Sequence, residues 1–148
     1  LYTSQSYSGL GKLHGYQDAL SGCGLPVRED YIRQCPKDVL AARDLLMKLH
    51  DSGLCFDAVM TSDDTLAVGA VKYAHATKRS IPDELSIIGY NNSSYAVCTD
   101  PELPSIDSKI EALCTTTINT LMGVFNGSNV PSRTTIAADL IKRATTKF

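Results

Sequence analysis

The sequence predicts an α/β domain built on a doubly wound parallel β-sheet, and two observations support this fold class. Segments of strand length alternate with helical segments of about 10 to 15 residues, which is typical of parallel strands joined by right-handed helical crossovers. Several strand segments, such as "AVM" at 58–60 and "LSIIGY" at 85–90, are continuous apolar runs, as expected for strands covered on both faces. The length of 148 residues suits one domain with a sizeable core.

The first predicted elements are the end of a strand, a helix and a short strand. "LYTSQS" at 1–6 is interpreted as the last two residues of a strand followed by a loop. A helix is predicted over 8–20, and the glycines and proline of "SGCGLP" end it. Its apolar residues recur at near-helical spacing: Leu10, Leu13, Tyr16 and Leu20. "DYIRQC" at 30–35 predicts a short strand.

Two helix and strand pairs follow. "KDVLAARDLLMKLHDSG" at 37–53 has leucines at helical spacing and ends in a glycine, so it predicts a helix. "FDAVMTS" at 56–62 predicts a strand, and "DDTLAVGAVKYAHATK" at 63–78 predicts a helix with small apolar residues on one face. "IPDE" at 81–84 is then the turn that leads into the buried strand at 85–90.

The pattern changes after residue 100. "SKIEALCTTTINTLMGVFNG" at 108–127 carries apolar residues at i, i+3 and i+4 spacing, which predicts a long amphipathic helix closed by Gly127. "NVPS" at 129–132 is a loop, and "TTIAADLIKRATT" at 134–146 is predicted to be a final extended segment with a bend at Asp139.

Composition narrows the function classes. A formal net charge of −2 argues against a nucleic-acid-binding surface, which needs clustered lysine and arginine. No apolar run approaches the roughly 18 residues that span a membrane. The five cysteines form no CxxC pair and fit neither a disulfide framework nor a zinc site. We interpret them as small buried residues of a cytoplasmic protein, and nothing in the sequence calls for a cofactor.

The candidate ligand site lies where parallel strands end. In doubly wound sheets ligands bind beyond the carboxyl ends of the strands, which here points to residues 3–12, 35–38, 61–65 and 90–94. Asn91 and Asn92 also suit turns with positive φ, and the two roles are compatible. Asp63 and Asp64 precede a helix, so capping competes with ligand binding; we assign Asp64 mainly to capping and keep Asp63 as a ligand candidate.

Five segments in order resemble one known family. "GKLHGYQDAL" is similar to the motif R-x-x-G-F-x-x-A-L, "DAVMTSDDTLAVGAVKYA" to A-V-F-x-x-N-D-x-x-A-x-G-A-x-x-A, and "IPDELSIIGYNN" to V-P-x-D-I-S-V-I-G-Y-D-D. "PELPSID" and "LIKRATT" are similar to P-P-L-T-T-I and L-V-x-R-x-S-T. Together they resemble the effector-binding region of bacterial regulators of the lactose-repressor and galactose-repressor (LacI) type, which is itself similar to type I periplasmic sugar-binding proteins.

The resemblance implies a region of two lobes around a small-molecule cleft, with three crossings of the chain. Residues 1–107 would form the C-terminal lobe, incomplete at its N-terminus. Residues 108–137 would belong to the N-terminal lobe, and residues 138–148 would be a strand that recrosses. DNA would be bound only through a headpiece absent from this chain, under allosteric control by a small-molecule effector such as a sugar.

The resemblance also implies site residues. Lys12 stands where the family usually has an effector-binding arginine, and an ammonium cannot reproduce the bidentate guanidinium. Asp63 stands at a family asparagine and Asn91 at a family aspartate, so carboxylate and amide are exchanged, which changes the hydroxyls that the site can read. Ser8 and Ser108 are further candidates by position.

The same comparison implies a twofold dimer, because a dimeric regulator reads paired half-sites. Its interface would include Val68, Val97, Cys98 and Thr99, although burial inside the chain is the simpler interpretation of Val68.

Two other functions remain open. A periplasmic sugar-binding protein of a transporter shares the lobe architecture, but the five cysteines and the "LIKRATT" ending favour a regulator. An enzyme with Asp63 and Asp64 as a metal or carboxylate pair lacks a nucleophile, a phosphate loop and metal-ligand spacing, so we do not expect catalysis.

Overall fold

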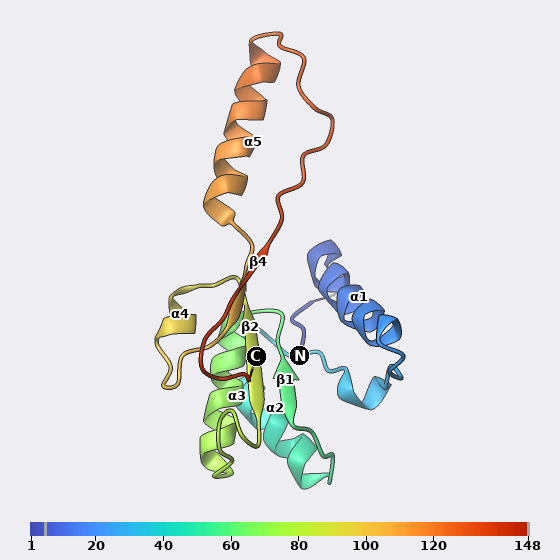
Figure 1. Cartoon of the computed structure of the whole chain (residues 1–148), viewed down its shortest axis with the longest axis vertical. Coiled ribbons are helices and arrows are strands. Elements are labelled where there is room, and N and C mark those ends of the chain that lie inside the picture. The colour runs from blue at the N-terminus through green and yellow to red at the C-terminus, as the bar shows by residue number, and fades with distance from the viewer. Residues whose placement is uncertain (5, 148) are drawn as a thin grey trace.

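The computed structural model describes residues 1–4 and 6–147, and its centre is a four-stranded mixed β-sheet (Figure 1). The strand order is β1 (Ala58–Met60), β2 (Ser86–Tyr90), β3 (Ser105–Asp107) and β4 (Asp139–Ile141). β1, β2 and β3 are parallel, whereas β4 runs antiparallel to β3. The predicted α/β class is confirmed, and the parallel arrangement holds for the first three strands.

Side-chain caps set where three of the helices begin. α1 (Tyr7–Gly22), α2 (Val39–Asp51) and α3 (Asp64–Ala76) are preceded by Ser6, Asp38 and Asp63, whose side chains accept bonds from backbone N–H groups of the first turn. The other helices are a 3₁₀ turn η1 (Glu29–Tyr31), a short α4 (Ser94–Val97) and α5 (Ile110–Phe125).

The core lies between α2, α3 and the sheet. α3 is its centre, because nine of its residues are buried and its apolar side chains contact both α2 and β2. The buried apolar cluster includes Leu46, Val59, Val71, Tyr73, Leu85, Ile87 and Leu103. α2 and α3 approach closely at Gly69, where an added Cβ would lie 2.5 Å from the Ala42 Cβ and 2.6 Å from the Val39 carbonyl oxygen. The close approach of the two helices therefore requires glycine at this position, because there is no room for a Cβ.

α5 stands away from the sheet, and the segment after it returns through β4 (Figure 1). The helix confirms the prediction over 108–127 to within two residues at each end. No residue of α5 is buried against the described part of the chain. Its exposed apolar side chains are Ile110, Leu113, Ile118, Leu121, Met122, Val124 and Phe125.

Two strand predictions were wrong in part. Residues 30–35 form the end of η1 and a single bridge from Gln34 to Tyr2 instead of a strand. Tyr2 makes both backbone bonds of this bridge: its N–H donates to the Arg33 carbonyl, and its carbonyl accepts the Cys35 N–H. In the final segment only Asp139–Ile141 is a strand, and a turn follows it.

The cysteines also differ from the prediction. Cys35 is buried, but Cys23, Cys55, Cys98 and Cys114 are exposed, and all five are free. Cys114 lies on α5, whose surface is uncovered, and the other exposed cysteines lie outside the strands and long helices that form the core. Among the described residues, no helix is long and apolar enough to cross a membrane.

Candidate functional site

The loops after β1 and β2 bring Asp63 and Asn91 together, as the sequence predicted for the carboxyl edge of the sheet. Asp63 Oδ1 accepts the Thr65 N–H at 2.9 Å, which caps α3. Its other oxygen, Oδ2, accepts the Asn91 Nδ2–H at 2.9 Å and lies 2.7 Å from Lys37 Nζ. One carboxylate thus joins a helix start, a strand end and a third loop.

The ionised form of Asp63 is favoured by these bonds. Burial by itself would raise the pKa of the carboxyl, but the Lys37 ammonium and the Thr65 bonds outweigh it and hold the pKa below its ordinary value. A carboxylate only accepts hydrogen bonds, so Asn91 must turn its amide NH₂ toward Asp63. Asn91 Oδ1 is then left as an acceptor with no partner among the described residues. The residue has φ +97°, and its N–H donates to the Ile106 carbonyl at 2.8 Å.

Lys12 reaches the same edge from α1. Its Nζ donates to the Ser62 carbonyl at 2.9 Å and lies 3.8 Å from the centroid of the Tyr90 ring, a cation–π contact. Burial lowers the pKa of Lys12, Asp63 opposes this change, and the Lys37 charge adds to it. Lys12 thus contacts the residues next to Asp63 and Asn91, Ser62 and Tyr90, but it lines the larger cavity and not the one that Asp63 and Asn91 line. Two N–H bonds of the Lys12 ammonium remain for another acceptor.

Lys37 is a site residue that the sequence reasoning missed. It lies in the loop 35–38, which was predicted to face the site, and its side chain is 61% exposed while ion-paired with Asp63. The available signal was its position directly before Asp38, the cap of α2. A cavity of about 410 Å³ opens here. Its lining residues are Lys37, Asp38, Val39, Asp63, Thr65, Asn91, Ser93 and Tyr95.

Ser8 and Ser108 are not in this cluster. Ser8 is exposed in the first turn of α1, and Ser108 is half-buried between β3 and α5. Neither lines the cavity at the strand ends. Both remain candidates for a ligand that extends beyond that cavity.

The predicted dimer residues lie on α3 and around α4. Val68 is half-buried on α3. Val97 is 52% exposed at the end of α4, and Cys98 beside it is also exposed. Thr99 Oγ1 is buried without a hydrogen-bond partner among the described residues.

Asp64 has a role that differs from the prediction. The cap of α3 is Asp63, and Asp64 is the first helical residue, with its side chain fully buried. Its Oδ2 accepts the Ser93 N–H at 2.7 Å and the Ser93 hydroxyl at 2.8 Å. Its Oδ1 accepts the Ser105 hydroxyl at 2.6 Å. A Cβ at Gly89 would overlap Asp64 Oδ1, which explains the glycine in "IIGY". Asp64 therefore joins α3 to the ends of β2 and β3.

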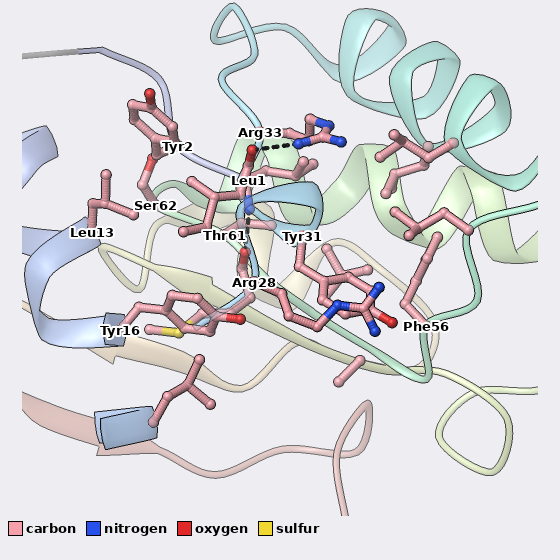
Figure 2. Close-up of a pocket in the computed structure, with 18 of the residues that line it drawn as sticks. Leu1, Tyr2, Leu13, Tyr16, Arg28, Tyr31, Arg33, Phe56, Thr61 and Ser62 are labelled. Atoms are coloured by element: carbon pink, nitrogen blue, oxygen red, sulfur yellow. Dashed lines mark hydrogen bonds between the residues drawn. The ribbon is translucent and has the colours of Figure 1, made fainter. Parts of the chain in front are cut away.

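A larger cavity of about 910 Å³ lies between α1 and the open side of β1. Figure 2 shows Leu13 and Tyr16 of α1 on one side of it and Phe56 on another, with the Arg28 guanidinium over the Tyr31 ring. Its lining is mainly apolar, and it meets the polar edge at Lys12, Thr61, Ser62 and Tyr90. No group of three or more His, Cys, Asp or Glu residues in the described ranges is placed to hold a metal ion.

Comparisons with known proteins give one family. The model of the periplasmic binding protein-like domain matches residues 4–146. A helix-turn-helix (HTH)-type transcriptional regulator of Lachnoclostridium phytofermentans is 51% identical over 148 residues, which is 100% of this chain and 44% of that protein. The HTH-type transcriptional regulator AscG of Escherichia coli strain K12 is 27% identical over 93% of this chain and 41% of its own length. The chain thus spans less than half of these relatives.

Solved structures agree. The Escherichia coli transcriptional repressor ascG superposes with a TM-score of 0.89 at 26% identity, over 97% of this chain and 53% of that one. A complex of the regulator CelR with cellobiose gives a TM-score of 0.89 at 21% identity, over 98% and 45% of the two chains, and shows the shared fold. The ordered motifs, the α/β fold and these matches give the same result: the chain belongs to the periplasmic-binding-protein-like domain family, in the form found in LacI-type transcriptional regulators.

Proposed function

We propose that this chain is the C-terminal part of the effector-binding and dimerisation region of a cytoplasmic LacI-type transcriptional regulator. One observation carries the proposal: Lys12, Lys37, Asp63 and Asn91 converge at the carboxyl ends of β1 and β2. Ligands of open α/β sheets bind at this edge. The relatives in which the same domain occurs are HTH-type transcriptional regulators, which supports a sensor and not a catalyst.

The effector is a small polyhydroxylated molecule, a sugar. Asn91 Oδ1 offers an acceptor, and the Lys12 and Lys37 ammonium groups offer donors. A sugar hydroxyl both donates and accepts, so neighbouring hydroxyls can satisfy this mixed set. The CelR–cellobiose complex and a sugar-binding LacI-family regulator from Escherichia coli share the fold, which is consistent with this ligand class.

The exposed apolar side chains of α5 support the lobe arrangement. Residues 1–107 form the C-terminal lobe, residues 108–137 belong to a second lobe, and residues 138–148 recross. The exposed apolar side chains of α5 need a partner surface, and the second lobe supplies it. Effector bound between the lobes would change their relative orientation and, through it, operator binding by a headpiece outside this chain.

Dimerisation would use Val68 and the exposed end of α4, with Val97, Cys98 and Thr99. Support comes from the exposure of Val97 and Cys98 next to the core helix α3. A dimeric lac repressor shares the fold, with a TM-score of 0.89, which is consistent with a dimer here.

The test is calorimetric titration of the intact regulator with a panel of mono- and disaccharides. We expect at least one sugar to bind, with Asn91→Ala and Asp63→Ala each weakening it about tenfold, because each loses bonds worth about 1.5 kcal/mol. Lys147→Met, a change in an exposed ion pair with Asp83, is the control and should leave affinity unchanged. Unchanged affinity in both site variants would refute the assignment of the site. Binding of no sugar would refute the ligand class.

A further inference from the structure

The Asn91 loop is held from behind by two charged side chains. Asn91 and Asn92 both have positive φ, at +97° and +48°. Asparagine adopts a positive φ more readily than other residues apart from glycine, and here the surroundings hold the loop in that conformation. The residues that fix it are Asp64 on one side and Arg143 on the other.

Arg143 links the loop to the segment that follows β4. Its Nη2 donates to Asn92 Oδ1 at 2.7 Å, and its Nη1 donates to the Leu103 carbonyl at 2.8 Å. Its Nε lies 3.4 Å from the Glu102 carboxylate. The Arg143 side chain is only 14% exposed, so the rigid guanidinium fork joins these groups largely out of water.

Asp64 links the loop to β3. The Asn92 N–H donates to the Ser105 hydroxyl at 2.9 Å, and that hydroxyl donates to Asp64 Oδ1. Ser93 binds the other oxygen of Asp64 through both its N–H and its hydroxyl. Three donors and the start of α3 offset the burial of this charge. Every residue from 91 to 93 thus has a bond into the α3, β3 or Arg143 framework.

The framework leads out of the lobe. β3 runs directly into α5, and β4 returns from it, so these two strands are the connections between the sheet and the distant helix (Figure 1). A shift of β3 or β4 would move Ser105 or Arg143, and each of these side chains is bonded to Asn92. The position of Asn91, one residue earlier, would change with them.

We propose that Asp64 and Arg143 are positioning residues that couple the orientation of the crossing strands β3 and β4 to the side chain of Asn91. The identity of the ligand that Asn91 contacts rests on the function proposed above, whereas the coupling between the strands and Asn91 does not depend on it. Neither residue touches the ligand. Both determine whether Asn91 Oδ1 stands where a ligand hydroxyl can reach it.

The first test is hydrogen exchange in the intact protein without ligand. Arg143→Met should raise exchange at the Asn92 and Ser93 amides about tenfold, the loss expected for a charged hydrogen bond. Arg143→Lys should give an intermediate rate, because an ammonium lacks the planar fork that spans the two acceptors. Asp64→Asn keeps the shape and should raise exchange at Ser93. Lys147→Met, in the same terminal segment, should have no effect.

The second test is effector affinity and operator response in the same variants. Arg143→Met should weaken the bound sugar about tenfold and reduce the effector-induced change in operator affinity. Asn92→Gly, which accommodates the positive φ and removes the side chain that accepts from Arg143, should reproduce both effects while leaving the Arg143 bond to Leu103 intact.

The outcomes separate the two proposals. If amide hydrogen exchange at residues 91–93 in Arg143→Met equals that of the control while thermal stability falls, Arg143 stabilises the fold without positioning the loop, and the inference is wrong. Faster exchange at 91–93 in a protein that binds no sugar supports the positioning role and refutes the sugar function. Sugar binding that Asn92→Gly and Arg143→Met leave unchanged refutes the coupling and keeps the function.

Discussion

The contact between α2 and α3 makes Gly69→Ala a sharp test of how the core is packed. The added Cβ would stand 2.5 Å from the Ala42 Cβ, about 0.9 Å short of the 3.4 Å at which ordinary contact begins. It would also meet the Val39 carbonyl oxygen at 2.6 Å, so the obstacle includes main chain that cannot rotate away. The helices must therefore separate, or α3 must shift on β2.

The expected cost can be worked out from two opposing effects. Alanine is the better helix residue by about 1 kcal/mol, whereas overpacking a tight core costs about 1 to 3 kcal/mol and is at its upper end when backbone is involved. We expect a net loss of about 2 kcal/mol. Gly15→Ala in α1 is the matched control, because nothing lies within 4 Å of its Cβ; it should gain about 1 kcal/mol.

The assay is urea unfolding of the intact protein, followed by far-ultraviolet circular dichroism. Gly69→Ala should lower the midpoint, and Gly15→Ala should raise it, at equal slopes. Adding Ala42→Gly to Gly69→Ala should recover only part of the loss, because the Val39 carbonyl remains. A Gly69→Ala protein as stable as the wild type would refute this account of the packing.

Three further predictions concern the site and its surroundings. The pKa of Asp63 is lowered in the folded protein, so its stabilising effect is complete above the ordinary value of 3.8 and is lost as pH falls through the folded value. Asp63→Asn should therefore reduce the acid limb of the stability curve, which is the fall of the unfolding temperature with falling pH in thermal unfolding scans. Lys37→Met should leave the fold intact but reduce the steepness of that limb, because it removes the cation paired with Asp63. Lys12→Arg should bind sugar at least as tightly as the wild type and Lys12→Met about tenfold more weakly, measured by calorimetry.

Much of the fold could be predicted because the spacing of apolar residues in long segments distinguishes helix from strand. The helices at α2, α3 and α5 and the strand "SIIGY" follow directly from apolar spacing. The three-residue β3 could not be found in this way, because "SID" follows a proline-bounded turn and is too short to show a period. The strand expected at 30–35 was wrong because strand formation depends on a neighbour, and this segment pairs only through the single bridge from Gln34 to Tyr2.

The location of the candidate site was easier to predict than the side chains that form it. Topology puts Asp63 and Asn91 at the same edge, and the resemblance adds Lys12. Lys37 was missed because it contributes through the path of the 35–38 loop, which only the folded chain defines. Asp64 was misassigned because adjacent residues at a helix start point in different directions, and its partners Ser93 and Ser105 lie 29 and 41 residues away in the sequence.

The bonds from Thr145 to β2 have a consequence for the order in which the sheet is assembled. The Ile87 N–H donates to the Thr145 carbonyl at 2.8 Å, and the Thr145 hydroxyl donates to the Ile87 carbonyl at 2.7 Å, both in the interior. Residue 145 is synthesised 58 residues after Ile87, so these two bonds of β2 form only after the segment that follows β4 has emerged. A chain cut before Thr145 would therefore lose bonds at the centre of the sheet rather than at its edge.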